Sequence, residues 1–452
     1  MTEPDGAAAI DATFTHGSTM RHVLVMTGTG AVGLLAIFAV DFLSLLYVSR
    51  LGDPSLVAGV EYATQVLFFL ISVSIGLSIG VTALVSRTIG RGDGNGARRL
   101  AGSTLIHVLI ISNVLAAATF AFRGGLLGAV GATGAAFAVA DRFLLIAVPA
   151  NGLLALGMAL SGLLRAVGDA RRAMYVTLFG GIATAVLDPL LIFTLGLGVD
   201  GAAITTVLAR LVVLGVGVWA AVGVHRLVAW PRLDEAWRDW PALAAIALPA
   251  VLTNLAAPVS NGYVLRVFSQ FGEPTVAAFA IIDRITPVAF AILYALSGSV
   301  GPIVGQNYGA KLFGRVRRTL ADCFALSCVY TLAVWLLLAL AAPFLADLFG
   351  ATGRTRDIVV FYCRAGTAAW LFFACVFVAN AAFNNLGFPL LATAFNWGRA
   401  TLGTVPFVTL GARLGGPEGA YMGLTIGSAA FGVASVWVSF AVTARLARRS
   451  AA

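Results

Sequence analysis

Two aspartates stand inside long apolar segments of the chain. Asp41 lies within LLAIFAVDFLSLLYV and Asp188 within ATAVLDPLLIF. An ionised Asp at the centre of a bilayer costs about 2.5–3.5 kcal/mol, so such a residue is a candidate for a functional site. Burial and a neighbouring carboxylate both favour the neutral form of a carboxyl group or the binding of a cation. We therefore expect Asp41 and Asp188 to form an ion-coupling pair for H⁺, or for Na⁺ together with Thr206. The alternative is that each aspartate pairs with a buried arginine.

Hydroxyl and proline residues surround Asp188 in the sequence. Pro189 follows it directly and removes a backbone donor, which predicts a bend in this helix. Thr184 precedes Asp188 by one helical turn and shares its face. The next apolar segment adds the hydroxyls of Thr205 and Thr206. We expect Thr184 and Thr206 to assist ion coupling and Thr205 to line a substrate cavity.

The second half of the chain offers a different set of polar residues within its apolar segments. One carboxylate is followed directly by an arginine, and adjacent residues point to different faces of a helix. The others are amides and one further arginine, and amides in membrane helices commonly join one helix to another. We expect the substrate cavity of this half to be lined by Asn254, Asn261, Asp283, Arg284, Asn380 and Arg399.

The composition requires lipid as the solvent for most of the chain. Of the 452 residues, 60% are hydrophobic and 11% are charged, compared with about 25% charged residues in soluble domains. Mean hydropathy is +0.94, and apolar stretches of about 20 residues recur with polar breaks between them. The pattern predicts an all-α integral membrane protein with twelve transmembrane helices, at 23–49, 55–84, 100–122, 139–164, 173–195, 201–224, 243–268, 275–304, 319–342, 358–383, 389–410 and 418–443.

The chain is an imperfect duplication. Residues 52–54 (GDP) return as 272–274 (GEP), and residues 201–202 (GA) return as 419–420, about 220 positions later. Six spans per half make the two repeats parallel, an arrangement of secondary transporters whose substrate site lies between the halves. The acidic pair is not duplicated, because Asp41 returns as Asn261 and Asp188 returns as Val405. We expect coupling to belong to the first half.

The basic residues predict how the chain is oriented. With the N-terminus inside, the inside segments hold eighteen basic residues and the outside loops hold four. This bias predicts a multi-pass protein of the plasma (inner) membrane with both termini cytoplasmic. It also accounts for the net charge of +9 without a nucleic-acid partner. The expected parts are a disordered cytoplasmic tail at 1–20, an N-terminal six-helix bundle at 21–224, a cytoplasmic interfacial linker at 225–242, a C-terminal six-helix bundle at 243–443 and a basic cytoplasmic tail at 444–452.

Three segments resemble the multidrug and toxic compound extrusion (MATE) family of transporters, and the resemblance covers nearly the whole chain. They are residues 63–93, residues 278–310 and residues 185–206, AVLDPLLIFTLGLGVDGAAITT, the most specific of the three. The resemblance implies a V-shaped pair of parallel-repeat six-helix bundles, acting as a monomer in membrane lipid. It also implies an antiporter without a cofactor that exports cationic or amphipathic organic compounds in exchange for H⁺ or Na⁺.

The acidic pattern is nearest to the archaeal and DinF-like members of that family. Asp41 and Asp188 match the acidic positions that those members use for coupling, and Thr206 matches a hydroxyl near them. Thr184 stands where many members carry Asn. The carboxylates that other members carry in the seventh and tenth spans are missing, and Asn254 and Asn380 occupy those neighbourhoods.

Other function classes receive less support from the sequence. A flippase for lipids or lipid-linked oligosaccharides would need a strongly cationic cavity, which Arg266, Arg284 and Arg399 favour and the acidic first half opposes. An enzyme is not expected, because the chain has no HExxH, no nucleotide-binding loop and no GxSxG with triad partners. Its four cysteines and four histidines lack metal-ligand spacing, so no structural metal is expected.

Overall fold

The fold consists of helices in two compact units. The structure, a computed structural model of the whole chain, describes residues 10–451, and the regular elements among them are all helical. Among the described residues, those up to His16 and 28–251 form the first unit, and residues 17–27 and 252–451 form the second. The packing units and the predicted parts, with a linker at 225–242, are divided at different residues. The linker and the start of the next helix belong to the first unit, and Gly17–Thr27 belongs to the second.

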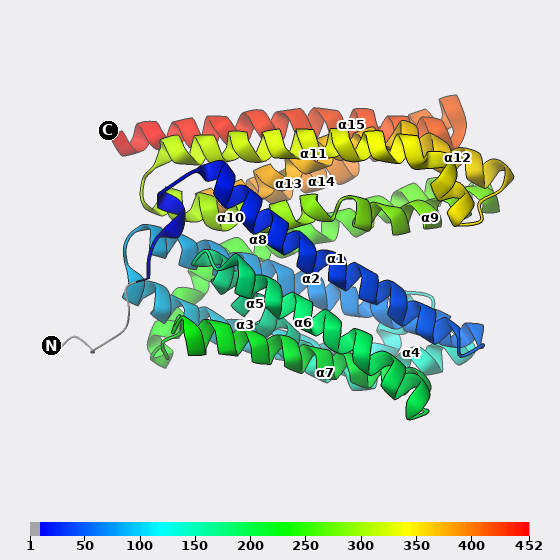
Figure 1. Cartoon of the computed structure of the whole chain (residues 1–452), viewed down its shortest axis with the longest axis horizontal. Helices are drawn as coiled ribbons and strands as arrows, with labels where there is room; N and C mark the ends of the chain where they lie inside the picture. Colours follow the sequence, from blue (N-terminus) through cyan, green and yellow to red (C-terminus); the bar gives the residue numbers. More distant parts are fainter. Residues whose placement is uncertain (1–9, 452) are drawn as a thin grey trace. The chain divides into compact units, whose positions relative to one another are not determined.

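The helices of the first unit run side by side along their length (Figure 1). The first helix is unbroken from end to end, and several later ones contain a short turn of 3-10 or π geometry. In chain order the elements are η1 (Thr13–Thr15), α1 (Thr19–Ser49), α2 (Pro54–Gly90), α3 (Gly94–Ala129), α4 (Gly134–Ala147), η2 (Val148–Ala150), α5 (Asn151–Ala166), α6 (Ala170–Pro189), η3 (Leu190–Thr194), α7 (Gly198–Val218), η4 (Trp219–Val224) and α8 (Leu233–Ser269), which continues into the second unit.

The second unit repeats this order with different breaks. Its second apolar segment is bent by 48° between two helices, and its last two are joined through a kink. The elements are α9 (Glu273–Ala289), α10 (Ala291–Gly309), α11 (Phe313–Leu348), α12 (Gly353–Arg364), η5 (Gly366–Ala368), α13 (Ala369–Leu386), α14 (Pro389–Gly398), η6 (Arg399–Gly403) and α15 (Val405–Ala451).

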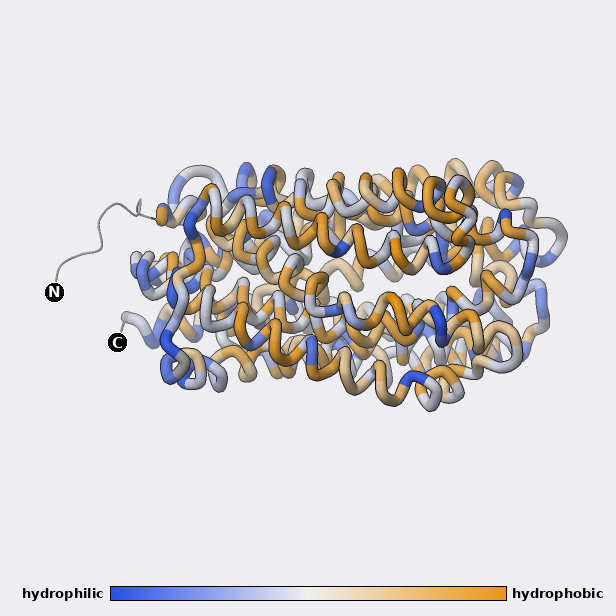
Figure 2. The backbone as a smooth tube through the Cα atoms, turned by 90° about the horizontal axis from the view of Figure 1, so that it is seen from below, coloured by the Kyte–Doolittle hydropathy of each residue, from blue (hydrophilic) through white to orange (hydrophobic). Residues whose placement is uncertain are grey.

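The helices account for the twelve predicted spans. Ten stretches are long and apolar enough to cross a membrane, and the bent pair α9 and α10 adds an eleventh. The last stretch, Pro389–Ser450, contains two spans because Gly415 and Gly416 leave the helical conformation inside α15. Hydrophobic residues fill the middle of the helices and hydrophilic residues gather near their ends (Figure 2). Large apolar side chains such as Val114, at 65% exposure, and Leu340, at 73%, have only lipid to cover them.

Left-handed turns show the duplication in the backbone. Gly131, Gly134 and Gly168 have positive φ, and so do the glycines 219 positions later, Gly350, Gly353 and Gly387. A side chain with a Cβ is strained in this region, which explains why glycine stands at both copies of each turn. The pairing also places the elements of one half in register with those of the other.

The predicted tails differ from the structure. Part of the predicted tail 1–20 lies outside the described residues, but Thr13–Thr15 form a 3-10 helix and α1 begins at Thr19. The buried ring of Phe14 and a hydrogen bond from Thr13 Oγ1 to the carbonyl of Val167 (3.3 Å) hold this segment to the first unit. At the other end, α15 remains helical through the predicted tail 444–452 as far as Ala451.

Candidate functional site

The acidic pair of the first half is brought together by three helices. Asp41 projects from α1 and Asp188 from the end of α6, where α7 packs against both α6 and η3. Asp188 is 2% exposed and Asp41 is exposed on its helix. The two carboxylates lie close enough to interact electrostatically. One carboxylate therefore lies in the protein interior, and the other opens onto the surface of the same half.

A serine that the sequence did not single out completes this pair. Ser44 Oγ donates a hydrogen bond to Asp188 Oδ2 across 144 positions of sequence. Ser44 stands three residues after Asp41 on α1, so both lie on one face of that helix. The three-residue spacing from Asp41 was the sequence feature that could have identified Ser44 as a member of the site.

Thr205, and not Thr206, faces Asp188. The Thr205 side chain interacts with the Asp188 carboxylate and is fully buried. Its hydroxyl oxygen has no hydrogen-bond partner of good geometry among the described residues. The hydroxyls of Thr206 and Thr184 bond instead to carbonyls one turn earlier, those of Ala202 (3.0 Å) and Gly180 (3.1 Å).

The backbone around Asp188 departs from a regular helix. Pro189 follows Asp188, and the chain continues as the π-helical turn η3. Such turns are rare in helices and are frequent at functional sites. The sequence predicts a bend at Pro189, and the structure has a π-helical turn directly after it.

No arginine neutralises the pair. Among the ion pairs of the described residues none includes Asp41 or Asp188. Arg210, a buried arginine of α7, donates from Nη1 to the carbonyl of Ala147 at 2.7 Å, where α4 gives way to η2. The structure therefore argues against the alternative that these aspartates serve only in ion pairs with arginine.

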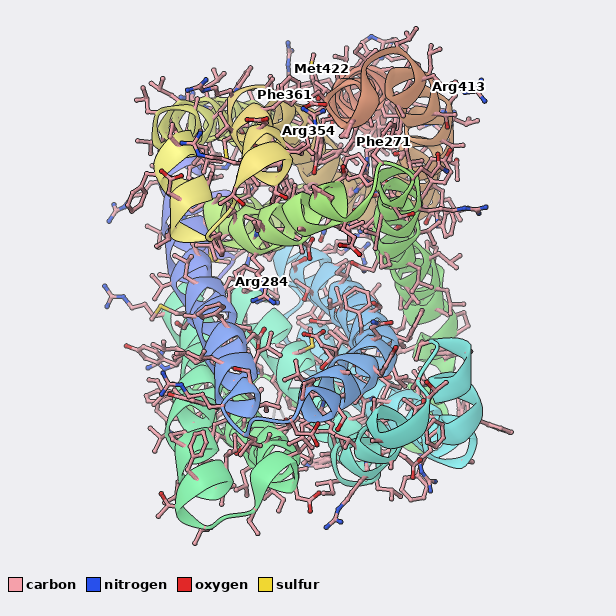
Figure 3. The ribbon with its side chains drawn as sticks, turned by 90° about the vertical axis from the view of Figure 1, so that its right-hand side faces the viewer. Phe271, Arg284, Arg354, Phe361, Arg413 and Met422 are labelled. Atoms are coloured by element: carbon pink, nitrogen blue, oxygen red, sulfur yellow. The ribbon has the colours of Figure 1, made fainter. Side chains whose placement is uncertain are left out.

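The candidate residues of the second half differ widely in exposure. Asn254 is half-buried, whereas Asn261, Asp283 and Arg284 are exposed. Arg284 extends away from the ribbon of α9 (Figure 3). Asn380 is 7% exposed, and its Oδ1 has no hydrogen-bond partner among the described residues.

Arg399 is the other deeply buried residue of this set. It begins the π-helical turn η6 and is 7% exposed. Its guanidinium carbon lies 4.5 Å from the centre of the Phe373 ring. These residues of the second half do not form one polar cluster like that around Asp188.

An ionic cluster joins the α5–α6 turn to the end of η4. The Asp169 carboxylate accepts from Arg172 Nη1 (2.6 Å) and from the Arg172 backbone N–H (3.0 Å), and it lies 2.6 Å from His225 Nε2. Burial raises the pKa of Asp169, but the hydrogen bonds from Arg172 and His225 and the charge of Arg172 lower it by more than burial raises it. The pKa of Asp169 therefore lies below its ordinary value. The cluster fixes the start of α6, the helix that carries Asp188.

Comparison with known proteins gives the family. A family profile described as MatE matches residues 31–190 and again residues 249–409, one match in each half. The chain belongs to the MatE family. It is therefore a multi-pass membrane transporter, and its two matched regions coincide with the two repeats that the sequence predicts.

Individual MatE relatives span most of the chain. The "FAD transporter" of Shewanella oneidensis is 27% identical over 425 residues, which are 93% of this chain and 94% of that protein. The "Probable multidrug resistance protein NorM" of Agrobacterium fabrum is 27% identical over 74% of each chain. The crystal structure of the Vibrio cholerae MATE transporter VcmN in the bent form matches with a TM-score of 0.87 at 24% identity, covering 94% of this chain and 97% of that one. This likeness confirms the predicted all-helical MATE fold.

Proposed function

We propose that this MatE transporter is an antiporter that exports amphipathic organic compounds in exchange for H⁺ or Na⁺, coupled through Asp41 and Asp188. The observation that carries the proposal is the meeting of these two carboxylates with the hydroxyls of Ser44 and Thr205 in one half. Two carboxylates without a basic partner repel each other, so taking up a proton or a cation is favourable. The open position of Asp41 and the buried position of Asp188 give the ion an entrance and a binding group.

The geometry also supports a role for Thr205 in place of Thr206. A buried hydroxyl group without a hydrogen-bond partner destabilises the fold by about 1–3 kcal/mol relative to a hydrogen-bonded one. A cation bound by Asp188 could be coordinated by the Thr205 hydroxyl oxygen as well, which would give that oxygen a partner. Thr206 already bonds to its own helix. We infer that Thr205→Val weakens the apparent affinity for the coupling ion about tenfold, whereas Thr206→Val leaves it within twofold.

Transport in reconstituted vesicles tests the coupling. Vesicles loaded with an ethidium-like dye receive either a pH gradient or a Na⁺ gradient at symmetrical pH, and dye movement is followed by fluorescence. Asp41→Asn should reduce gradient-driven transport to the level of empty vesicles. Asp347→Asn, which removes an exposed carboxylate paired with Arg356 at 2.9 Å, is the matched control. Wild-type transport by the Asp41 variant would refute the proposal.

The substrate is the less constrained part of the proposal. Relatives named for multidrug resistance favour cationic or amphipathic compounds, and the relative named FAD transporter favours a flavin dinucleotide. The same vesicles loaded with FAD in place of dye decide between the two classes. A flippase remains the alternative, and preferential binding of a lipid pyrophosphate over both probes would favour it.

The orientation of the chain is part of the same proposal. The excess of basic residues on the ends of the helices next to the α2–α3 turn supports cytoplasmic termini. We propose a monomer in the plasma (inner) membrane. Labelling of single cysteines introduced at Arg98 and at Arg354 from outside intact cells tests the orientation, since only the second should react.

A further inference from the structure

We propose that the second half contains a binding site for planar aromatic anions, with Arg399 as the group that binds the anionic substituent. This inference rests on the proposed function, because it names a substrate class for the same transporter. It concerns residues of the second unit only: Arg399, Phe373, Trp370, Tyr294 and Phe377. None of them belongs to the ion-coupling pair.

Arg399 is a buried cation without an anion. It is 7% exposed, and among the described residues no carboxylate forms an ion pair with it. Its side chain contacts the face of Phe373 and lies near the hydroxyl of Tyr294. An arginine at the centre of a membrane helix is unfavourable and is normally kept with a partner. A ring face attracts a cation less strongly than a carboxylate or phosphate does, so the contact with Phe373 does not replace an anionic partner.

A second buried arginine, Arg210, does have a hydrogen-bond acceptor in the protein, so burial alone does not explain why Arg399 has none among the described residues. Arg210 is 6% exposed and its Nη1 donates to the carbonyl of Ala147 at 2.7 Å. The guanidinium of Arg399 has no described hydrogen bond to a protein acceptor. Its planar fork of N–H donors is suited to a carboxylate or a phosphate, which it can bind through two parallel hydrogen bonds.

Aromatic rings lead from Arg399 to the surface of the unit. Phe373 lies against Trp370 (centroids 5.4 Å apart), which also contacts Tyr294 at 5.9 Å. Tyr294 in turn lies 5.6 Å from Phe377 and is 36% exposed. Aromatic side chains bind planar ring systems by stacking, and this interaction tolerates different substituents on the bound ring. Trp370 is already stacked on Phe290 (centroids 4.3 Å apart), and Arg399 covers the face of Phe373, so the rings left to a ligand are the exposed Tyr294 and the half-buried Phe377. The cluster therefore combines two accessible rings with a cation for a charged substituent.

The nearby carboxylate does not neutralise this arginine. Asp283 interacts electrostatically with Tyr294, but its charged neighbour is Arg284 on the same helix. Asp283 and Arg284 are both exposed, whereas Arg399 is buried. An anion that reaches Arg399 therefore meets one uncompensated positive charge.

A pair of flavins with the same ring system tests the site at equilibrium, without any gradient. Riboflavin is uncharged, and flavin mononucleotide adds one phosphate. Purified wild-type protein in phosphate-free buffer should bind flavin mononucleotide at least about tenfold more tightly than riboflavin, measured by flavin fluorescence anisotropy. Equal binding of the two flavins would overturn the proposal.

Three variants locate the preference. Arg399→Gln should abolish it, Arg399→Lys should reduce it to a few-fold because the fork is lost, and the control Arg266→Gln, at an exposed arginine of α8, should keep it. If Arg399→Gln does not give folded protein, an undiminished preference in Arg399→Lys overturns the proposal. Because binding is measured without a gradient, a failure of ion coupling leaves the preference for flavin mononucleotide in place, whereas a failure of this site removes it while gradient-driven transport of the dye persists.

Discussion

The two halves bury different charges in the membrane, although they share one repeated pattern: each buries an arginine, Arg210 or Arg399, but among the described residues only the first also buries a carboxylate. The first half holds Asp41 and Asp188 with the hydroxyls of Ser44 and Thr205. In the second half Asp188 is replaced by Val405 in the register of the repeat, and the deeply buried charge is Arg399. The comparison teaches that duplication preserved the helices and their turns while the chemistry diverged.

Glycines explain why the second half has no room for the same site. Thr205 corresponds to Gly423, one of a series in α15 that also contains Gly419 and Gly427. A Cβ at Gly423 would clash with the carbonyl oxygen of Phe407. Small residues spaced by four let two membrane helices approach closely. Where the first half packs a hydroxyl against a carboxylate, the second packs backbone against backbone.

The largest effect is expected from moving the acidic charge between the halves. Asp188→Asn should lower gradient-driven transport at least tenfold, because the amide takes up no proton near neutral pH and lacks the negative charge that would hold Na⁺. Adding Val405→Asp to that variant should not restore transport, since Gly423 supplies no hydroxyl at the matching position. Transport in vesicles measures both. Recovery in the double variant would show that the halves are interchangeable.

The next effect concerns the bend that only the second half has. Pro287 of α9 corresponds to Phe68 of the continuous helix α2, and Phe68 is 41% exposed. Phe68→Pro removes a backbone hydrogen bond inside α2 and should cost about 3 kcal/mol or more of the free energy of unfolding. Phe68→Ala is the control, expected to cost far less. Thermal unfolding of the purified proteins measures the difference, and equal stability of the two variants would contradict it.

A smaller loss is expected where the helices of the second half touch. Gly423→Ala should cost about 1–3 kcal/mol, because the added methyl group clashes with the carbonyl of Phe407 and forces apart the two segments of α15 that the kink at Gly415 and Gly416 separates. Gly262→Ala, at a position with open space around it, should change stability little. The same unfolding assay compares them. If Gly423→Ala left the free energy of unfolding unchanged, the two segments would not be in close backbone contact at Gly423 and Phe407.

The smallest effect is a pH-dependent one at the start of α6. Asp169 caps this helix through the Arg172 N–H, whereas its counterpart Phe388 provides no side-chain cap for α14. The pKa of Asp169 is lower in the folded protein than in the unfolded chain, where it is about 3.9. The ionised carboxylate therefore stabilises the fold above that pH, and this stabilisation is lost as the pH falls through the folded-state pKa. Asp169→Asn should cost about 1–2 kcal/mol at pH 7.

The same variant should lose its disadvantage once the pH falls below the lowered folded-state pKa of Asp169, where the wild-type carboxyl is protonated as well. Unfolding by denaturant in detergent, at pH 7 and below that pKa, measures the difference from wild type. A deficit that stays constant between them would assign the effect to packing and not to the charge.

Much of the fold was predictable because lipid imposes simple rules. A span needs about 20 apolar residues, so the twelve spans and their charged ends follow from composition. The duplication follows from recurring glycines, and the choice of Asp41 and Asp188 as candidates for a functional site follows from the cost of a carboxylate in lipid. The boundaries between parts were less predictable, because the linker residues pack on α3, as in the ion pair Arg99–Asp239 (2.7 Å).

The sequence by itself determined which residues carry charge in the membrane, and the tertiary structure decided which partners they meet. Ser44 reaches Asp188 across 144 positions, and Thr205 faces it while Thr206 bonds to its own helix. These choices depend on how α1, α6 and α7 are rotated against one another. The isolation of Arg399 is likewise a property of packing. Helix rotation is set by contacts along the whole helix, and no local pattern of residue types contains it.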